Sequence, residues 1–307
     1  MNVNDAENSK ELQKIKRLRF LDFLLGYRGW FTRQDLIEQF KIAPAGATKD
    51  IAEYKSLTKV DGSSFEGDVS RNLEFDDSQK KYVTSDTYIP LYNLKFSSAV
   101  SLLRRSNVEG FLGAHKSIPI ETPIKLSNPK VEILSNLSRC IGSKKVAEVN
   151  FHSSNRGKST REISPHSFFE SEDKWYVRAY CHKDSKFKSF KLSRFESVIS
   201  TSNEPPLKSD PIKDDQWQRW VKLQIIPHDK LDSGDQSALR TEFNLELGEC
   251  MEIKVRAAIC GYWLSHWKVD CSPDGKTGEE DKHYQLRLAN LETLYDVDSA
   301  KLAPGFI

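Results

Sequence analysis

The stretch "KWYVRAYC", residues 174–181, holds the side chains of this sequence with the clearest potential for chemistry. Its alternation predicts a β-strand with one apolar face, while the other face carries Tyr176, Arg178 and Tyr180. A half-buried strand does not need an arginine between two tyrosines. Because tyrosine rings stack on bases and a guanidinium donates paired hydrogen bonds to phosphate, this face is a candidate binding surface for a nucleotide or single-stranded nucleic acid.

A simpler interpretation of the same face stays open. The strand could expose it to solvent, with Arg178 paired to Glu172 or Asp184. In both interpretations Lys191 and Ser193 of the next strand extend the polar face. Because the two tyrosines and the arginine alternate with core-facing residues, their replacement is expected to leave the fold largely intact.

Cysteine and histidine spacing gives no sign of a metal site or a catalytic centre. The five cysteines are an odd number and form no CxxC pair, which fits reduced thiols in a cytosol rather than a disulfide framework. His266 and His283 lack the short paired spacing of structural zinc sites. The sequence contains no G-x-S-x-G, P-loop or H-E-x-x-H motif. We expect no metal, no cofactor and no catalytic residue; a hydrolase with a thiol nucleophile stays a minor alternative.

Length and charge indicate several domains with different partners. The chain has 307 residues, enough for two or three domains, and a formal net charge of +2, which excludes a generally basic, histone-like binder. Residues 139–200 contain thirteen Lys/Arg against seven Asp/Glu, whereas residues 201–307 contain thirteen against nineteen. The middle of the chain should therefore attract anions and the C-terminal third should not.

The chain shows no membrane or export signal. It has no apolar run of membrane-spanning length, and its polar start, "MNVNDAENSK", does not resemble a signal peptide. A cytoplasmic protein that does not bind a membrane is expected.

The first ninety residues predict three helices followed by a β-hairpin. Apolar residues at helical spacing predict a first helix over about 11–25. In "FTRQDL", Thr32 and Asp35 form a capping-box pattern that begins a second helix ending near Phe40. Pro44 suits the first position of a third helix over about 44–57, and "RNLEFDDSQKKYVTS" predicts strand, turn and strand.

This order of elements is typical of a winged helix-turn-helix, which reads the DNA major groove, although a generic helical domain stays open. The third helix would turn Ile51 and Tyr54 inward and small or polar residues outward. The side chains expected to contact DNA are Thr32, Arg33, Ala45, Thr48, Lys49, Lys55, Arg71, Lys80 and Lys81.

The remaining segments predict a linker, a β-rich domain and a mixed domain. Residues 96–138 contain a proline-rich linker and a short connecting helix. Four or five short strands over 145–200 indicate a small barrel or a strongly bent sheet, and "TSNEPPLKSDP" marks the next boundary. The last hundred residues mix helix and strand, and the tryptophans at 263 and 267, with Leu264, fit either a dimer surface or a local core.

The block "REISPHSFF…KWYVRAYC…FKSFKLSRFESV" resembles the WYL domain, a small Sm-like β-barrel named for a Trp-Tyr-Leu run, here Trp175-Tyr176-Val177. The order of segments resembles the bacterial transcriptional regulators of the BrxR/CapW type, which are found beside phage-defence systems. The resemblance implies an α+β multidomain chain with a winged helix-turn-helix over 1–95, a linker and connecting helix over 96–138, a WYL barrel over 139–205, and a C-terminal α+β dimerisation extension over 206–307.

The resemblance also implies a homodimeric repressor that binds a palindromic DNA operator and senses a nucleotide or nucleic-acid ligand through the barrel. The ligand-binding residues it implies, together with the face described above, are His166, Tyr176, Arg178, Tyr180, Lys188, Lys191 and Arg194. Lys188 stands where these proteins often carry arginine, and lysine lacks the bidentate fork. The alternative function is an accessory module that binds RNA or single-stranded DNA through the barrel.

Overall fold

The computed structural model describes residues 3–60, 69–109, 123–154, 157–277 and 283–306. The chain divides into two compact units, Met1–Pro123 and Ile124–Ile307, and each is described by itself. Among the described residues, no helix combines the length and apolar character required to cross a membrane.

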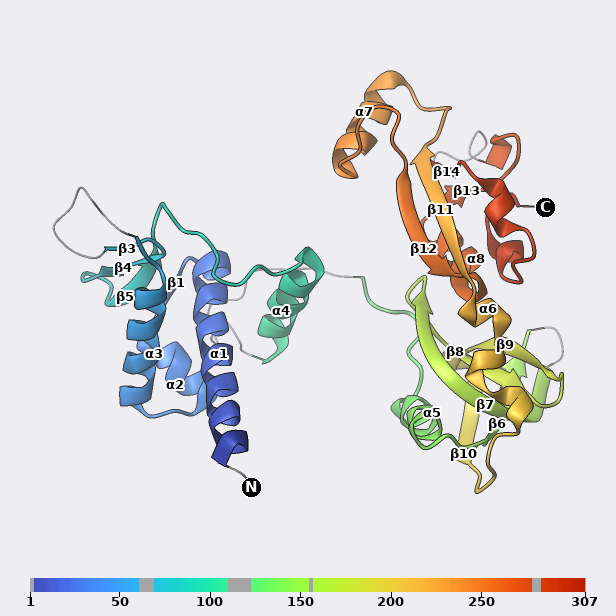
Figure 1. Ribbon diagram of the computed structural model, residues 1–307, viewed down its shortest axis with the longest axis horizontal. Helices are drawn as coiled ribbons and strands as arrows, with labels where there is room; N and C mark the ends of the chain where they lie inside the picture. The colour runs from blue at the N-terminus through green and yellow to red at the C-terminus, as the bar shows by residue number, and fades with distance from the viewer. Residues whose placement is uncertain (1–2, 61–68, 110–122, 155–156, 278–282, 307) are drawn as a thin grey trace. The chain divides into compact units, whose positions relative to one another are not determined.

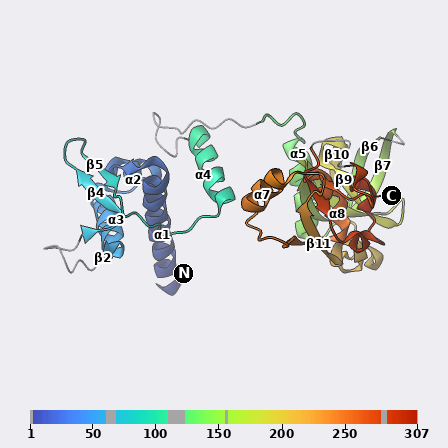
Figure 2. The same ribbon diagram turned by 90° about the horizontal axis from the view of Figure 1, so that it is seen from above.

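Unit 1 has the predicted helices and hairpin (Figures 1 and 2). Its three-stranded sheet has the order β1-β5-β4, with β1 inserted between the first two helices. A second pair, β2 and β3, precedes the hairpin. The elements are α1 (Val3–Arg28), β1 (Trp30–Phe31), α2 (Arg33–Phe40), α3 (Pro44–Leu57), β2 (Lys59–Val60), β3 (Val69–Ser70), β4 (Leu73–Asp76), β5 (Lys81–Thr84) and α4 (Phe96–Glu109).

The capping box predicted at the start of α2 is confirmed. The backbone N–H and the hydroxyl of Thr32 both donate to Asp35, at 2.6 and 2.8 Å. Arg28, at the end of α1, adds two hydrogen bonds to the same carboxylate at 2.7 and 2.9 Å. Burial opposes these contacts, yet together they lower the pKa of Asp35. The turn between α1 and α2 is thereby fixed by a single charged side chain.

Unit 2 begins with a helix that covers a five-stranded antiparallel sheet of order β10-β6-β7-β8-β9. Helix α5 packs Ile133, Leu137 and Cys140 into the sheet's core, so the predicted connecting helix is part of this domain's core. The elements are α5 (Val131–Ser143), β6 (Ala147–Ser153), β7 (Gly157–Ser171), β8 (Lys174–Cys181), β9 (Lys186–Lys191), η1 (Leu192–Arg194) and β10 (Phe195–Ser200).

A second, four-stranded sheet of order β12-β11-β14-β13 forms the C-terminal part of unit 2. Helix α8 buries Cys260 and Leu264 against it, with Trp263 and Trp267 packed at the margin of the same core. Leu264 is therefore a core residue rather than a surface one. The elements are β11 (Trp220–Pro227), α7 (Ser233–Glu242), β12 (Met251–Arg256), α8 (Ala257–His266), β13 (Val269–Asp270), β14 (Leu286–Leu288), η4 (Leu291–Leu294) and η5 (Ala300–Leu302).

Residues 207–219 connect the two sheets of unit 2 and are called the strap below. The strap consists of three short helices, η2 (Leu207–Ser209), η3 (Pro211–Lys213) and α6 (Asp215–Gln218). Asp214 caps the N-terminus of α6 by accepting a hydrogen bond from the Trp217 amide at 3.2 Å. The sequence pattern indicated only a boundary near this segment.

Candidate functional site

The polar face of β8 is covered by the strap and by α8. Val177, Ala179 and Cys181 point into the core, as the alternation predicted. Arg178 and Tyr180 are also buried, each 5% exposed. The face therefore does not lie open. Because it is buried, replacing its residues is now expected to cost stability rather than to spare the fold. The expectation of an open face fails because the strap, which is remote in sequence, packs on the second face.

Arg178 pairs with Asp214, and not with Glu172 or Asp184. Its Nε and Nη2 donate to the two carboxylate oxygens of Asp214 at 2.7 and 2.9 Å, while Nη1 lies 3.4 Å from Ser189 Oγ. Asp214 is 1% exposed. This two-point geometry is the strongest form of an arginine–carboxylate contact, and both charges are removed from water.

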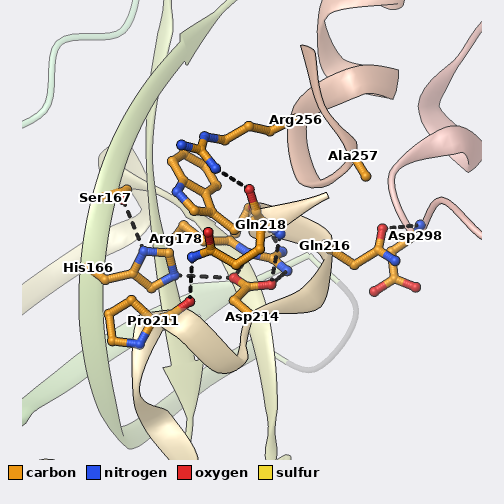
Figure 3. A network of polar contacts seen from close by, with 12 residues as sticks. His166, Ser167, Arg178, Pro211, Asp214, Gln216, Gln218, Arg256, Ala257 and Asp298 are labelled. Carbon is orange, nitrogen blue, oxygen red and sulfur yellow. Dashed lines mark hydrogen bonds and ion pairs between the residues drawn. The ribbon is translucent and has the colours of Figure 1, made fainter. Parts of the chain in front are cut away.

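His166 is brought to the same carboxylate by a β-bulge. Along β7, Pro165 pairs with Ala179 and Ser167 with Arg178, so His166 is the extra residue. Its Nε2 lies 3.2 Å from an oxygen of Asp214, and its Nδ1 lies 2.9 Å from Ser167 Oγ (Figure 3). An ionised carboxylate only accepts, so Nε2 carries the proton of this hydrogen bond.

These contacts change the chemistry of Asp214. Burial alone would raise its pKa, but the hydrogen bonds from Arg178 and His166 outweigh burial and lower the pKa to about 2. The carboxylate is therefore ionised at neutral pH, inside the protein, in a set of donors suited to any two-oxygen anion.

Aromatic rings surround the ion pair. His166 meets Trp217 of the strap and Phe187 of β9 edge to face, at centroid distances of 5.5 and 5.8 Å. Tyr180 lies edge-on to Phe187 at 5.1 Å, and Lys208 of the strap stands over its ring at 5.7 Å. The strap thus places one acidic and one basic residue on the predicted binding face.

Tyr176 is covered by a different element. It stacks on Phe169 at 5.0 Å with 8° between the ring planes, and it meets Tyr262 of α8 edge to face at 5.0 Å. Burial raises the pKa of both tyrosines. This end of the face is a packing contact between the two sheets' domains.

The structure separates Lys188 from the other predicted ligand residues. In the β8–β9 register Lys188 stands opposite Ala179, whereas Ser189 stands opposite Arg178, so Lys188 belongs to the other face of the sheet. It pairs with Asp184, which also contacts Arg161 at 3.4 Å. The family resemblance had grouped Lys188 with the polar face, but the register places Lys188 on the opposite face of the sheet.

Lys191 and Arg194 lie on the expected side, near Tyr176. Lys191 stands opposite Tyr176 in the register. Burial, together with the neighbouring charges of Lys174 and Arg194, lowers the pKa of Lys191. Arg194 is exposed and hydrogen-bonds Ser154 at 3.2 Å. The edge of the face therefore retains a group of closely spaced positive charges.

A cavity of about 680 Å³ opens beside His166. One wall is the bulge of β7, the second is the end of α5 with Lys144 and Lys145, and the third is formed by residues 204–211, which include the start of the strap. A cavity of this size can accommodate a nucleotide-sized ligand. Its lining carries Lys144 and Lys145 but also Glu204 and Asp210, so any preference for an anion must come from the donors around Asp214.

The far side of the strap is bound to the C-terminal sheet. Arg256 of β12 donates to the Trp217 carbonyl and lies over the Trp217 and Trp220 rings, 5.1 and 4.5 Å from their centroids. Gln216 Nε2 donates to the Asp296 carbonyl at 3.0 Å, and Gln216 Oε1 accepts from the Asp298 amide at 3.0 Å. Figure 3 shows the contact with Asp298. Any displacement of Asp214 must therefore disturb the C-terminal domain.

In unit 1, helix α3 presents the predicted DNA-contacting residues to solvent. Ile51 and Tyr54 are buried as predicted. On α2, Arg33 is exposed and its Nη1 lies 3.5 Å from the Thr48 hydroxyl, so α2 and α3 place these two groups together. The other predicted residues of α3 that are exposed are Ala45, Lys49 and Lys55.

The inner face of α3 is fixed by two carboxylates. Arg17 of α1 binds Asp50 at 2.6 and 3.2 Å. The Tyr54 hydroxyl donates to buried Asp22 at 2.5 Å, and burial with this contact raises the Tyr54 pKa. These contacts orient α3 with its polar side outward.

The predicted wing residues differ in their surroundings. Lys80 lies in the β4–β5 turn, is exposed and pairs with Asp77 at 3.1 Å. Lys81 stands over the Trp30 ring at 4.9 Å. Arg71 is partly buried, and its Nε has no hydrogen-bond partner among the described residues. Thr32 is engaged in the α2 cap and is only partly exposed.

No cluster of three or more His, Cys, Asp or Glu able to hold a metal occurs in the described part of the chain. Burial raises the pKa of Cys260 to about 12 and raises that of Cys271 as well. Such thiols stay protonated and are poor nucleophiles.

A winged helix-turn-helix joined to a small bent β-sheet domain and a further α+β domain defines a transcriptional regulator of modular type. Three family models match successive parts of the chain. The BrxR transcriptional regulator winged helix-turn-helix domain matches residues 13–99, the WYL domain matches 132–199, and the BrxR C-terminal dimerization domain matches 220–294. The chain belongs to the BrxR family of WYL-domain transcriptional regulators.

Curated relatives align with most of this chain and with most of their own length. The DNA-binding transcriptional repressor CapW of Escherichia coli (strain KTE188) is 24% identical over 91% of this chain and 90% of the relative. The protein of the same name from Pseudomonas aeruginosa is 26% identical over 92% and 91%, respectively. The one from Stenotrophomonas maltophilia is 25% identical over 83% of each chain.

Removing the arginine tests the ion pair. In Arg178→Ala, Asp214 would be left buried without its main partner, and we expect the free energy of unfolding to fall by about 3–5 kcal/mol. The control is Lys222→Ala, which removes an exposed pair with Glu252 and should cost no more than about 1 kcal/mol. Urea denaturation measures both. Equal losses in the two variants would contradict a buried, paired Arg178.

The lowered pKa of Asp214 predicts an acid-sensitive contribution to stability. Because the folded pKa of about 2 lies below the ordinary value of 3.8, the contribution is complete above pH 4 and is lost as the pH falls towards 2. Between pH 4 and pH 2, the free energy of unfolding of Asp214→Asn should therefore fall by roughly 2 kcal/mol less than that of the wild type. Parallel curves of unfolding free energy against pH would refute the assignment.

Proposed function

We propose that this protein is a homodimeric repressor that binds a palindromic operator of a phage-defence locus through α3 and the wing, and releases or retains DNA according to an anionic effector bound at the WYL sheet. The main support is α3 itself. Its outer face carries Thr48, Lys49 and Lys55, while Asp50 and Tyr54 hold its inner face in place. A helix so fixed can present short polar and basic side chains to the major groove.

The effector part rests on the donor set around Asp214 and on the neighbouring cavity. Arg178 and His166 can bind phosphate oxygens, and Tyr180 with Phe187 offers rings for stacking. The effector class that fits is a nucleotide or a short nucleic-acid strand. The alternative, an accessory module that binds RNA or single strands continuously through this sheet, fits poorly because Arg178 and Tyr180 are buried under the strap.

DNA binding can be tested on a duplex from upstream of the gene. Lys49→Ala should weaken binding to this duplex more than to a random one. Lys80→Ala should weaken binding to both and reduce the salt slope by about 1, because one phosphate contact is lost. Lys301→Ala, with the same loss of charge on an exposed C-terminal residue, is the control. If a gel shift series found all three variants equal to the wild type, the winged-helix interface would be wrong.

Dimerisation provides a second test. One recognition helix reads few base pairs, so a useful operator needs two half-sites and a protein with two-fold symmetry. Light scattering at micromolar concentration should give about twice the 35.2 kDa of one chain. A monomeric mass there would overturn the proposed assembly.

A further inference from the structure

The strap covers the same side chains that the sequence offers to a nucleic-acid ligand. Asp214 occupies the donors of Arg178 and His166, and Lys208 covers the ring of Tyr180. Both covering residues belong to one short segment, which leads directly into the C-terminal domain. The binding face is therefore closed by the protein's own chain.

The Asp214 carboxylate has partners that could also bind a phosphate group. Two oxygens face the guanidinium fork at 2.7 and 2.9 Å, and one of them also meets His166 Nε2 at 3.2 Å. A phosphate group in the same place could accept all three hydrogen bonds, because arginine recognises carboxylate and phosphate through the same planar geometry.

The strap is built to detach more easily than the sheets it joins. Within this fully described segment only Ser209 and Asp214 are buried, whereas Leu207 and Ile212 are 84% and 73% exposed. Its helices contain three or four residues each. A segment with few buried apolar contacts opens at low free-energy cost. Two contacts hold the strap on the sheet: the Asp214 ion pair, and the partly buried ring of Trp217, which packs on the cluster that contains Phe169.

We propose that the strap is an autoinhibitory latch: Asp214 acts as an internal substitute for an effector phosphate, and a nucleotide or short strand displaces it from Arg178 and His166. This inference rests on the effector site of the proposed function. The cavity beside His166 gives the ligand access, since residues 204–211 form one of its walls. Displacement frees Tyr180 and Phe187 for stacking and pulls on Trp217, which Arg256 ties to β12.

The latch makes a quantitative statement about affinity. A tethered carboxylate competes with the effector at a high effective concentration. The apparent dissociation constant for the effector equals the intrinsic constant divided by the fraction of molecules in which the latch is open. Weakening Asp214 must therefore strengthen effector binding, which is the opposite of what a residue that contacts the ligand would do.

The experiment uses the full-length protein and a 5′-phosphorylated tetrathymidylate with a 3′ fluorophore, followed by fluorescence anisotropy. Asp214→Asn keeps the α6 cap, because asparagine is a good N-cap, but it removes the charge that holds Arg178. We expect it to bind the probe about tenfold more tightly than the wild type, as the closed fraction falls. Competition by thymidine 5′-monophosphate decides whether a nucleotide suffices or a strand is required.

Two matched variants separate the latch from other effects. Asp232→Asn makes the same change at the exposed N-cap of α7, where Asp232 accepts a hydrogen bond from the Asp235 amide at 2.9 Å, and should leave probe affinity unchanged. Gln216→Ala loosens the outer attachment of the strap without touching the ion pair, and should raise affinity about twofold to threefold. Because Gln216 is only partly buried and carries no charge, this variant keeps the test valid if Asp214→Asn folds poorly.

A measurement on the unmodified protein completes the test. Saturating probe should accelerate hydrogen exchange of the amides in residues 211–219, because the strap leaves the sheet. Unchanged or slower exchange there, or equal or weaker probe binding by both Asp214→Asn and Gln216→Ala, overturns the latch. If the variants behave as expected but the wild type fails to bind any upstream duplex, the latch stands and the proposed repressor function falls.

Discussion

A charged residue inside unit 2 constrains everything around it. Arg178 projects from the centre of β8 and is buried, so it must have an anion beside it or the fold would carry an uncompensated charge. The anion is Asp214, which a 36-residue excursion through β9, β10 and the strap returns to the sheet. The position of Asp214 in turn fixes three features: the position of α6, the contact of Trp217 with His166, and the hydrogen bond from Arg256 to the Trp217 carbonyl.

Such a pair is a poor means of gaining stability, because two desolvated charges can be replaced by apolar residues at little cost. It is better suited to a protein with two states, one in which the pair is formed and one in which another anion has replaced Asp214. Removing either partner is costly, but exchanging one anion for another is not. The geometry around Arg178 therefore favours exchange of the Asp214 carboxylate for another anion over loss of any anion. In the proposed latch, the anion of a ligand takes the place of Asp214.

In unit 1, a buried charge holds the elements in one arrangement. Asp22 accepts hydrogen bonds from Tyr54 and from the Leu91 and Tyr92 amides, at 2.5, 3.1 and 3.0 Å. Its acceptors are occupied by groups of the same unit, which ties α1 to α3 and to the segment after the hairpin. This arrangement keeps the outer face of α3 in one orientation, as a groove-reading helix requires.

Local patterns were sufficient to predict much of this molecule. The capping box at Thr32, the proline at the start of α3 and the alternation in β8 each act within one turn or one strand, and each element lies where the sequence placed it. The resemblance carried by residues 161–198 supplied the domain order. Strand β11 was overlooked, although residues 221, 223 and 225 alternate with polar neighbours and are buried.

The residues that the sequence could not place are those decided by contacts between distant segments. The two-residue alternation of side chains separates the two faces of β8. It does not predict that the strap covers the second face or that Asp214 contacts Arg178. The same period, applied across the β8–β9 register, would have assigned Lys188 to the core side; register itself was not readable from spacing alone. The bulge at His166 was equally hidden, because an extra residue leaves no compositional mark.

The charge asymmetry of the chain gains a physical meaning from these contacts. Residues 139–200 carry an excess of basic side chains and residues 201–307 an excess of acidic ones. The anion that the basic sheet attracts first is supplied by the acidic segment that follows it, at the fixed proximity that a tether provides. The affinity of an external anion for this site must therefore be compared with that of Asp214, and not with that of water. In the proposed latch, the apparent affinity for an effector is set by the difference between the two anions, so Asp214 adjusts sensitivity without contacting the effector.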